Sequence, residues 1–463
     1  MSNELRAADL EAVRQQLGRE PTTPFSVVAR CTGGHPLVIR NRPLDADGRP
    51  FPTLYWLTCP AAVKGISRLE SEGWIARLGD DSAIGSRLEE THRAYAAERG
   101  EMVPDAEEWG GVGGTRRGIK CLHAHYAYHL AGGDDAVGRW TAERAEPIHG
   151  TGPAGRVAAI DQGTNSTRLL VLEPRGPGED PLEITRDMRI TRLGKDVDRT
   201  GRLVPESIER TLGVIARFVR RARALHVERI RLGATSAVRD ASNKHELFEP
   251  LRTLIGVDPE VIDGDREAAL SFLGGTRGLD PSDGPFLLVD IGGGSTEFVF
   301  GRAPAIVDHA VSTQMGSVRL TERVRPSDPP SEEDLRALEA LIEPHLDEVE
   351  RTVPFRDARM LVAVAGTATT LQACALGLGR YDPDLIHRST LTIAAAERTL
   401  RDLAAMTNAE RAAIPVMPTG RGDVIVAGAI ILVSAMRRFG VERAVVSETD
   451  ILDGLALELL DVR

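Results

Sequence analysis

An acidic residue at the end of an apolar stretch, followed by three glycines and two hydroxyl residues, is a combination that can hold a phosphate group and a metal ion. It occurs at residues 286–300, FLLVDIGGGSTEFVF. The apolar segments 287–289 and 298–300 predict the two strands of a hairpin. Glycines between them leave room for an anion at the backbone N–H groups and permit the positive φ values of a tight turn. Taken alone, the motif also fits a plain glycine-rich β-turn.

The polar residues of this segment have separate expected roles. Asp290 is expected to hold Mg²⁺, or Mn²⁺ in its place, directly or through water, and Glu297 is a second acid within reach of the same ion. The residues of this loop expected to bind phosphate are Gly292, Gly293, Gly294, Ser295 and Thr296.

A second segment repeats the plan. Residues 157–171, VAAIDQGTNSTRLLV, again place an acid, a glycine and several polar side chains between two apolar strands. The residues expected to bind phosphate here are Asp161, Gly163, Asn165, Ser166 and Arg168. A third strand runs into a small-residue turn at 361–373, LVAVAGTATTLQA. In order and spacing the three loops resemble the phosphate and glycine motifs of the actin-like phosphotransferase superfamily, which implies two similar subdomains facing a cleft.

The elements that must position these loops belong to a chain too long for one ordinary core. The 463 residues predict two or three domains, and a composition of 42% hydrophobic and 27% charged residues is typical of a soluble globular protein. A net charge of −11 argues against nucleic-acid binding as the main function. It also means that a polyanionic substrate would have to be met by a local basic patch.

Other features of the composition indicate where the protein works. No apolar run approaches the roughly 20 residues of a membrane span, and residues 1–18 lack the apolar core of a signal peptide. The four cysteines are unevenly placed and predict no disulfide framework. We therefore expect a cytoplasmic protein without a membrane partner.

Composition shifts near residue 150, which predicts a domain boundary there. All four tryptophans and three of the four cysteines precede it, and the segment 150–155, GTGPAG, is typical of a linker. Residues 1–149 are expected to form a small α+β domain, with strands in 25–40 and 52–59 and helices at 61–78, 82–99 and 118–131.

This first domain contains a group of cysteines and histidines. His125 and His129 are one helical turn apart, and thiolates with imidazoles are the ligands that Zn²⁺ prefers. The spacing matches no standard zinc finger, and a buried cysteine often serves only as a small apolar side chain. Zinc binding and ordinary packing both remain open for this group: Cys31, His35, Cys59, Cys121, His123, His125 and His129.

Two family resemblances follow from longer stretches. FPTLYWLTCP, GISRLESEGWI and GIKCLHAHYA, within residues 51–127, resemble an actinobacterial family, domain of unknown function 501. From residue 156 onward the chain resembles the Ppx/GppA family of exopolyphosphatases and guanosine pentaphosphate phosphohydrolases, because AIDQGTNSTRLL and VDIGGGSTEFV match its two phosphate loops. In LGATSAVRDASN, residues 232–243, the resemblance implies that Arg239 faces the phosphate chain. A solvated arginine at a helix start is the alternative.

The resemblance also implies a catalytic base. In EVIDGDREAALSFLGG, residues 260–275, the base is Glu267, which would orient a water molecule and accept its proton. Many relatives have two adjacent acids here, whereas this chain has Arg266 before Glu267. An exposed glutamate paired with arginine is the alternative for Glu267.

The expected fold is α/β, an actin-like (ribonuclease H-like) pair of lobes preceded by the small α+β domain. Lobe I is predicted over 156–282 and lobe II over 283–443, with the strand and helix of 444–463 returning to lobe I. A homodimer is expected. The expected activity is Mg²⁺-dependent hydrolysis of terminal phosphate from inorganic polyphosphate. Hydrolysis of guanosine pentaphosphate (pppGpp) is the alternative, and a non-catalytic phosphate or nucleotide sensor of the same fold is a third. A kinase would need an acceptor-sugar pocket and an adenosine site.

Overall fold

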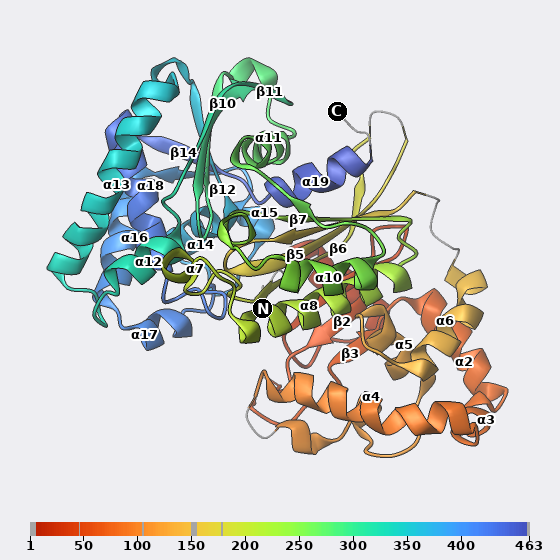
Figure 1. The fold of residues 1–463 in the computed structure, drawn as a ribbon. Coiled ribbons are helices and arrows are strands. Elements are labelled where there is room, and N and C mark those ends of the chain that lie inside the picture. The colour runs from red at the N-terminus through yellow and green to blue at the C-terminus, as the bar shows by residue number, and fades with distance from the viewer. Residues whose placement is uncertain (1–5, 46, 104–105, 150–154, 177–178, 461–463) are drawn as a thin grey trace.

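A computed structural model describes residues 6–45, 47–103, 106–149, 155–176 and 179–460. Three separate β-sheets organise these residues: a small one in the N-terminal part, and two larger ones whose facing ends form the cleft described below (Figure 1). The predicted linker 150–155 lies almost entirely outside the described residues.

The N-terminal part combines a three-stranded antiparallel sheet with helices. Its strands are β1 (Phe25–Arg30), β2 (Pro36–Asn41) and β3 (Tyr55–Leu57). Its α-helices are α1 (Ala7–Leu17), α2 (Pro60–Ser71), α3 (Trp74–Gly79), α4 (Ser82–Gly100), α5 (Leu122–Leu130) and α6 (Ala136–His149). The helix predicted at 61–78 is divided in two because Gly73 adopts a left-handed conformation, with φ of 81°. The helix predicted from residue 118 begins at Leu122, where the Cys121 side chain caps it.

The second sheet carries the first predicted phosphate loop. Its strand order is β6-β5-β4-β7-β8. The strands are β4 (Val157–Gln162), β5 (Ser166–Glu173), β6 (Leu182–Ile190), β7 (Arg229–Ala234) and β8 (Glu260–Val261). The antiparallel β4–β5 hairpin holds the loop at its turn, and β7 runs parallel to β4. The helices of this region are α7 (Val197–Thr200), α8 (Pro205–Ala224), α9 (Ser236–Asp240), α10 (His245–Ile255) and α11 (Gly264–Gly275).

The third sheet repeats the hairpin and carries the second loop. Its strand order is β11-β10-β9-β12-β14-β13. The strands are β9 (Phe286–Ile291), β10 (Thr296–Arg302), β11 (Ile306–Thr313), β12 (Met360–Val364), β13 (Ser389–Thr392) and β14 (Arg443–Val446). The remaining helices are α12 (Ser317–Val324), α13 (Glu332–Thr352), α14 (Ala365–Ala375), α15 (Pro383–Ile386), α16 (Ile393–Ala405), α17 (Asn408–Ala413), α18 (Ile425–Phe439) and α19 (Ile451–Leu459). Buried residues of α13, α14, α16 and α18 form a continuous core with β9, β10 and β12.

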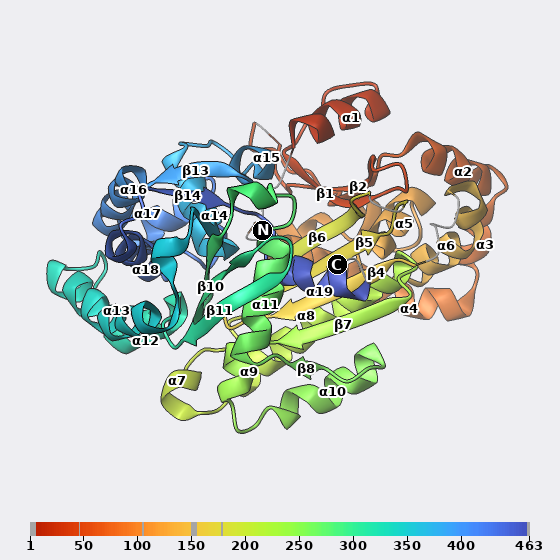
Figure 2. The same cartoon turned by 90° about the horizontal axis from the view of Figure 1, so that it is seen from above.

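The C-terminal segment differs from the prediction. Its strand, β14, pairs in parallel with β12 in the third sheet, so the expectation that this strand returns to the first lobe is wrong. Of this segment, only the final helix, α19, returns to the first lobe. The apolar side chains of α19 pack on β4, β5 and β7. Figure 2 shows this helix lying over the second sheet. Because β14 leads directly into α19, the segment 444–460 crosses from one lobe to the other at the cleft.

The N-terminal part and the second sheet share one hydrophobic core. The same cluster of buried side chains includes Val38 and Tyr55 from the small sheet and Ile215 and Phe218 from α8. The N-terminal part is therefore packed firmly against the lobe that carries the first phosphate loop. Among the described residues, no helix has the length and apolar character needed to cross a membrane.

Candidate active site

The two predicted phosphate loops are matching hairpin turns. In the first, the Gly163 N–H donates to the Ser166 carbonyl at 2.9 Å; in the second, the Gly292 N–H donates to the Ser295 carbonyl at 3.0 Å. The prediction that the glycines of the second loop supply positive φ values is wrong, since residues 292–294 all lie outside that region.

The second loop needs glycine because the two loops approach each other closely. A Cβ atom on Gly293 would lie 3.0 Å from Cβ of Thr164, and one on Gly294 would lie 2.4 Å from Oγ of Ser236. Gly316 is equally confined, because a Cβ there would lie 2.3 Å from the Gly293 carbonyl oxygen. The loops therefore face each other across one cavity, to which the start of α14 contributes Ala365, Gly366 and Thr367.

Three aspartates from separate elements converge beside these loops. Asp161 and Asp290 are the penultimate residues of β4 and β9, and Asp450 precedes α19; all three line the cavity. Arg168, which is opposite Asp161 in the β4–β5 ladder, donates to Asp161 Oδ2 at 2.7 Å and also pairs with Asp450. The guanidinium expected to bind phosphate is thus held by two carboxylates. Asp161 Oδ1 is buried and has no hydrogen-bond partner among the described residues.

Asp290 and Glu297 form a buried acidic pair. They face each other across the β9–β10 ladder, so both side chains lie on the same face of the sheet. Burial and the neighbouring charges of Glu297 and Asp450 raise the pKa of Asp290 to about 8, although Ser271 donates to its Oδ2 at 2.5 Å. Burial also raises the pKa of Glu297, against the effect of a 2.7 Å hydrogen bond from Ser312. A divalent cation near this pair would favour the ionised form of both carboxylates and offset the repulsion that helps to raise the pKa of Asp290.

Glu267, the predicted base, lies in the first turn of α11 and lines the same cavity. It is 8% exposed, so the alternative of an exposed helical glutamate does not apply. Burial and the charge of Glu297 raise its pKa well above the ordinary value, while Arg239 opposes that shift. A raised pKa suits a group that accepts a proton near neutral pH.

The two arginines near Glu267 are placed differently. Nη1 of Arg239 donates to Glu267 Oε2 at 2.6 Å and to the Ile262 carbonyl at 2.8 Å. Arg239 is not among the residues that line the cavity, and it contacts the cavity through Glu267. Arg266 points away from the cavity and pairs with Glu458 on α19. Arg266, the position at which this chain differs from many relatives, therefore does not contribute to the cavity.

The cavity does not contain the expected basic patch. Three arginines line it, against six acids: Arg168, Arg186 and Arg421, and Asp161, Asp187, Glu267, Asp290, Glu448 and Asp450. Arg421 is also engaged, because its Nη1 donates to the Gly366 carbonyl at 2.5 Å and to Oγ1 of Thr370 at 2.9 Å. A polyphosphate anion would be repelled from this surface unless divalent cations accompany it.

Most of the other predicted site residues are where they were expected. Those that line the cavity are Gly163, Asn165, Ser166, Gly292, Gly293, Gly294 and Ser295. Thr296 and Glu297 lie one layer deeper. The Thr296 hydroxyl donates to the Met315 carbonyl, and Glu297 lies beside Asp290 on the neighbouring strand.

The sequence reasoning missed Asp450 and Glu448. Asp450 follows a short apolar strand and caps α19 through the Leu452 N–H, at 3.0 Å. Like Asp161 and Asp290, Asp450 is an acid that follows an apolar run, and this sequence pattern could have predicted its place at the site. Glu448 belongs to the same connection and lines the cavity, where Tyr381 donates to it at 2.6 Å.

In the N-terminal part, the structure separates the cysteines and histidines considered for zinc. His125 is buried and hydrogen-bonded to Asp135 at 2.7 Å, and burial lowers the pKa of His129 to about 4. Cys59 precedes α2 and is buried, while Cys31 and His35 flank the β1–β2 turn. Of these seven residues, only Cys121 and His123 belong to a group of three side chains close enough to share a metal ion, and Glu70 is the third.

Comparison with solved structures identifies the class of fold. A crystal structure of an exopolyphosphatase-like protein is 37% identical in sequence, with a TM-score of 0.63, over 66% of this chain and 99% of that one. The Ppx/GppA family member of Aquifex aeolicus is 32% identical, with a TM-score of 0.57, over 67% of this chain and 99% of that one. The fold is the predicted two-lobed, actin-like α/β fold.

Sequence comparison then gives the family. The model of the Ppx/GppA phosphatase family matches residues 176–462, and Exopolyphosphatase 2 of Mycobacterium tuberculosis is 42% identical over 318 residues, which cover 66% of this chain and 98% of that protein. The chain belongs to the Ppx/GppA phosphatase family. A model of a protein family of unknown function, DUF501, matches residues 27–143. Both predicted resemblances are confirmed, and so is the prediction of a phosphoanhydride hydrolase.

Proposed function

We propose that the protein is an exopolyphosphatase that removes the terminal phosphate of inorganic polyphosphate with the help of Mg²⁺. The observation that carries the proposal is the position of Glu267, buried at a cavity between two facing phosphate loops and paired with Arg239. The 42% identity to Exopolyphosphatase 2 over nearly the whole length of that protein supports the same substrate.

Different residues of the cavity would have different roles in in-line hydrolysis. The N–H groups and hydroxyls of the two loops would hold the terminal phosphate, because successive backbone N–H groups in a turn can form an anion-binding site. Glu267 would orient a water molecule and accept its proton, which its raised pKa favours. Arg239 would fix the carboxylate of Glu267 through the 2.6 Å hydrogen bond. Arg239 is thus a positioning residue in this proposal.

The acids of the cavity fit a divalent metal ion. Carboxylate oxygens are the ligands that Mg²⁺ prefers, and the unpartnered Asp161 Oδ1 and the raised pKa of Asp290 both indicate a missing positive charge. We propose Asp290 as the main ligand, with Asp161 and Asp450 beside it and Glu297 in support. When bound, Mg²⁺ or Mn²⁺ would neutralise charge on the phosphate oxygens.

Guanosine pentaphosphate is the second candidate substrate. One wall of the cavity is formed by Pro415, Val416 and Met417, close to Pro418. An apolar wall can contact a nucleoside, whereas a polyphosphate chain has no apolar part to place there. This apolar wall is the observation that favours pppGpp as the second candidate substrate.

Phosphate release from short polyphosphate, long polyphosphate and pppGpp, measured in parallel, tests the proposal. We expect the fastest release from polyphosphate with Mg²⁺, no release with EDTA, and recovery when Mg²⁺ is returned. Faster release from pppGpp would favour the second candidate. Binding of all three without release would overturn the enzyme assignment and leave a sensor of the same fold.

A further inference from the structure

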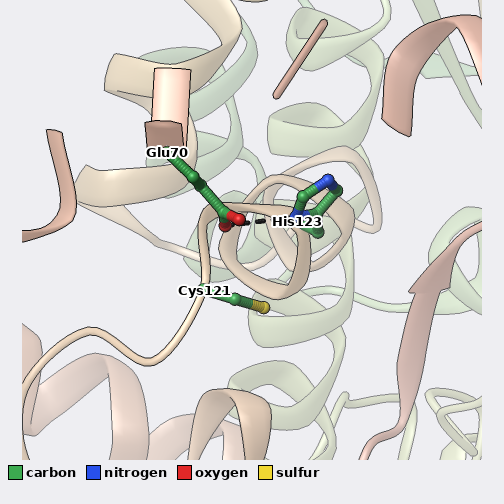
Figure 3. A group of neighbouring side chains, drawn as sticks. All are labelled: Glu70, Cys121 and His123. Carbon is green, nitrogen blue, oxygen red and sulfur yellow. Dashed lines mark hydrogen bonds and ion pairs between the residues drawn. The ribbon is translucent and has the colours of Figure 1, made fainter. Parts of the chain in front are cut away.

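The N-terminal part contains three side chains of metal-ligand type that meet at one point. Glu70 lies in the last turn of α2, Cys121 directly precedes α5, and His123 lies in the first turn of α5. One ligand atom from each lies within 4.8 Å of the other two, the only such group of three among the described residues. Figure 3 shows the Glu70 carboxylate directed at the His123 ring, with Cys121 beside them.

The hydrogen bonds of His123 define which ring nitrogen is available. Nε2 lies 3.1 Å from the Val63 carbonyl oxygen, which can only accept, so Nε2 carries a hydrogen. Nδ1 lies 3.1 Å from Glu70 Oε1. Nδ1 therefore faces a carboxylate, and either a proton or a metal ion must join the two atoms. A histidine that ligates a metal usually donates its other N–H to a carbonyl or carboxylate in this way.

The other two side chains are also oriented by the backbone. Glu70 Oε1 accepts the Leu122 N–H at 2.6 Å, and Cys121 Sγ accepts the Ala124 N–H at 3.4 Å. In a tetrahedral zinc site the ligand atoms are about 3.3–3.8 Å apart, so side-chain movements of about 1 Å would close the group around an ion.

A cavity gives access to the group. Cys121 and His123 line it, together with Val63, Ser67 and two lysines, Lys64 and Lys120. Glu70 lies on α2, as Val63, Lys64 and Ser67 do, but does not line the cavity. An ion held by the three side chains would therefore keep one position open towards the cavity, where the lysines favour a water-derived hydroxide or another anion.

We propose that Glu70, Cys121 and His123 form a zinc site with an open fourth position in the N-terminal domain. The set of one sulfur, one nitrogen and one oxygen favours Zn²⁺ over Mg²⁺, since Mg²⁺ takes oxygen ligands. The site is separate from the cleft and independent of the proposed phosphatase activity.

Cobalt substitution tests this site in the full-length protein. After treatment with a chelator, titration with Co²⁺ is expected to produce a thiolate-to-cobalt charge-transfer band, and added Zn²⁺ is expected to remove it. Co²⁺ held by the carboxylates of the cleft gives no such band, because no thiolate lies there among the residues that line it. The charge-transfer band therefore distinguishes the proposed zinc site from the carboxylates of the cleft.

Matched variants assign the ligands. Cys121→Ser is expected to fold, because serine is a good residue to precede a helix, and to lose the band completely. Cys31→Ser, which removes another cysteine of the same domain, is expected to keep it. Glu70→Gln and His123→Gln should each weaken Co²⁺ binding by about tenfold or more. A band that never appears, or that persists in Cys121→Ser, would show that a proton and not a metal joins Glu70 to His123.

Discussion

Glu267 illustrates how single residues set the chemistry of this cleft. Burial and two acidic neighbours, Glu297 and Asp290, disfavour its ionised form, while Arg239 alone is close enough to bond to it and favour that form. The balance leaves a carboxylate that accepts a proton more readily than an exposed glutamate does. Arg239 therefore controls the protonation of the base without lining the cavity.

Replacing Arg239 with methionine should raise the pKa of Glu267 further. Catalysis needs ionised Glu267, so the acidic limb of the pH–rate profile should move to higher pH. Each unit of pKa above the assay pH removes about tenfold of the ionised form, so activity at neutral pH should fall by roughly tenfold or more. Arg239→Lys, which keeps a charge, should restore part of the loss. An acidic limb at the same pH in all three proteins would show that Arg239 has no such role.

The residues of the site were predictable where local sequence decides their place. An acid at the end of an apolar strand, followed by glycine, led to Asp161 and Asp290, and both line the cavity. The partners of Arg168 and Arg239 were not predictable, because Asp450 and Glu267 lie 282 and 28 residues away in the chain. Only the folded chain shows that these arginines are paired.

At the scale of elements, the close approach of the two loops defines the cavity. Gly292–Gly294 were predicted to provide backbone freedom, but in the structure Gly293 and Gly294 provide space against Thr164 and Ser236. The sequence contains both loops but no information on how near they come to each other. That distance depends on how the two sheets pack around α11 and α19.

Gly294→Ala is expected to separate the loops. Its Cβ would lie 2.4 Å from Oγ of Ser236 and 2.7 Å from Oγ1 of Thr164, so one loop must move. A displacement of about 1 Å at an active site can cost about 100-fold in rate, and we expect a loss of that order in phosphate release.

Gly213→Ala is the matched control for this change. Gly213 lies in α8 with open space at its Cβ position, so alanine should leave activity unchanged and add slightly to stability. Thermal unfolding of both variants verifies that they fold. Full activity of Gly294→Ala would contradict the account of the loops.

The C-terminal segment shows a limit of prediction from sequence at the scale of elements. Its strand and helix were both predicted, but β14 joined β12 instead of the first sheet. A short apolar strand such as 443–446 can pair with any exposed parallel edge, so its pattern of residues cannot select a sheet.

At the scale of the whole molecule, a buried charge network joins the N-terminal domain to the first lobe. Glu98 of α4 pairs with Arg40 of β2 at 2.9 Å and with Arg217 of α8 at 2.8 Å. Tyr55 of β3 donates to Glu98 at 2.5 Å and accepts from Arg217 at 2.6 Å. The N-terminal domain and the first lobe are thus joined by buried charges, which water screens only weakly, in addition to their common apolar core.

Glu98→Gln should destabilise the protein at neutral pH by about 3–5 kcal/mol, because it leaves two buried arginines without their carboxylate. Burial opposes the ionisation of Glu98, but Arg217 and Arg40 lower its pKa to about 2 from the ordinary 4.5. Since the folded pKa is the lower one, the stabilisation is present above pH 4.5 and is lost as the pH falls towards 2.

Urea unfolding of both proteins at several pH values measures this effect. The difference in free energy of unfolding should shrink steadily between pH 4.5 and pH 2. A difference that does not depend on pH would mean that Glu98 is not ionised in the folded protein.

The most direct test of the central claim is phosphate release by Glu267→Gln beside Asp265→Asn. Both changes remove a charge from the first turn of α11, but Asp265 is exposed and does not line the cavity. We predict that Glu267→Gln loses about 100- to 10,000-fold in release from polyphosphate with binding retained, while Asp265→Asn keeps full activity. Equal activity of the two variants would contradict the assignment of Glu267 as the base.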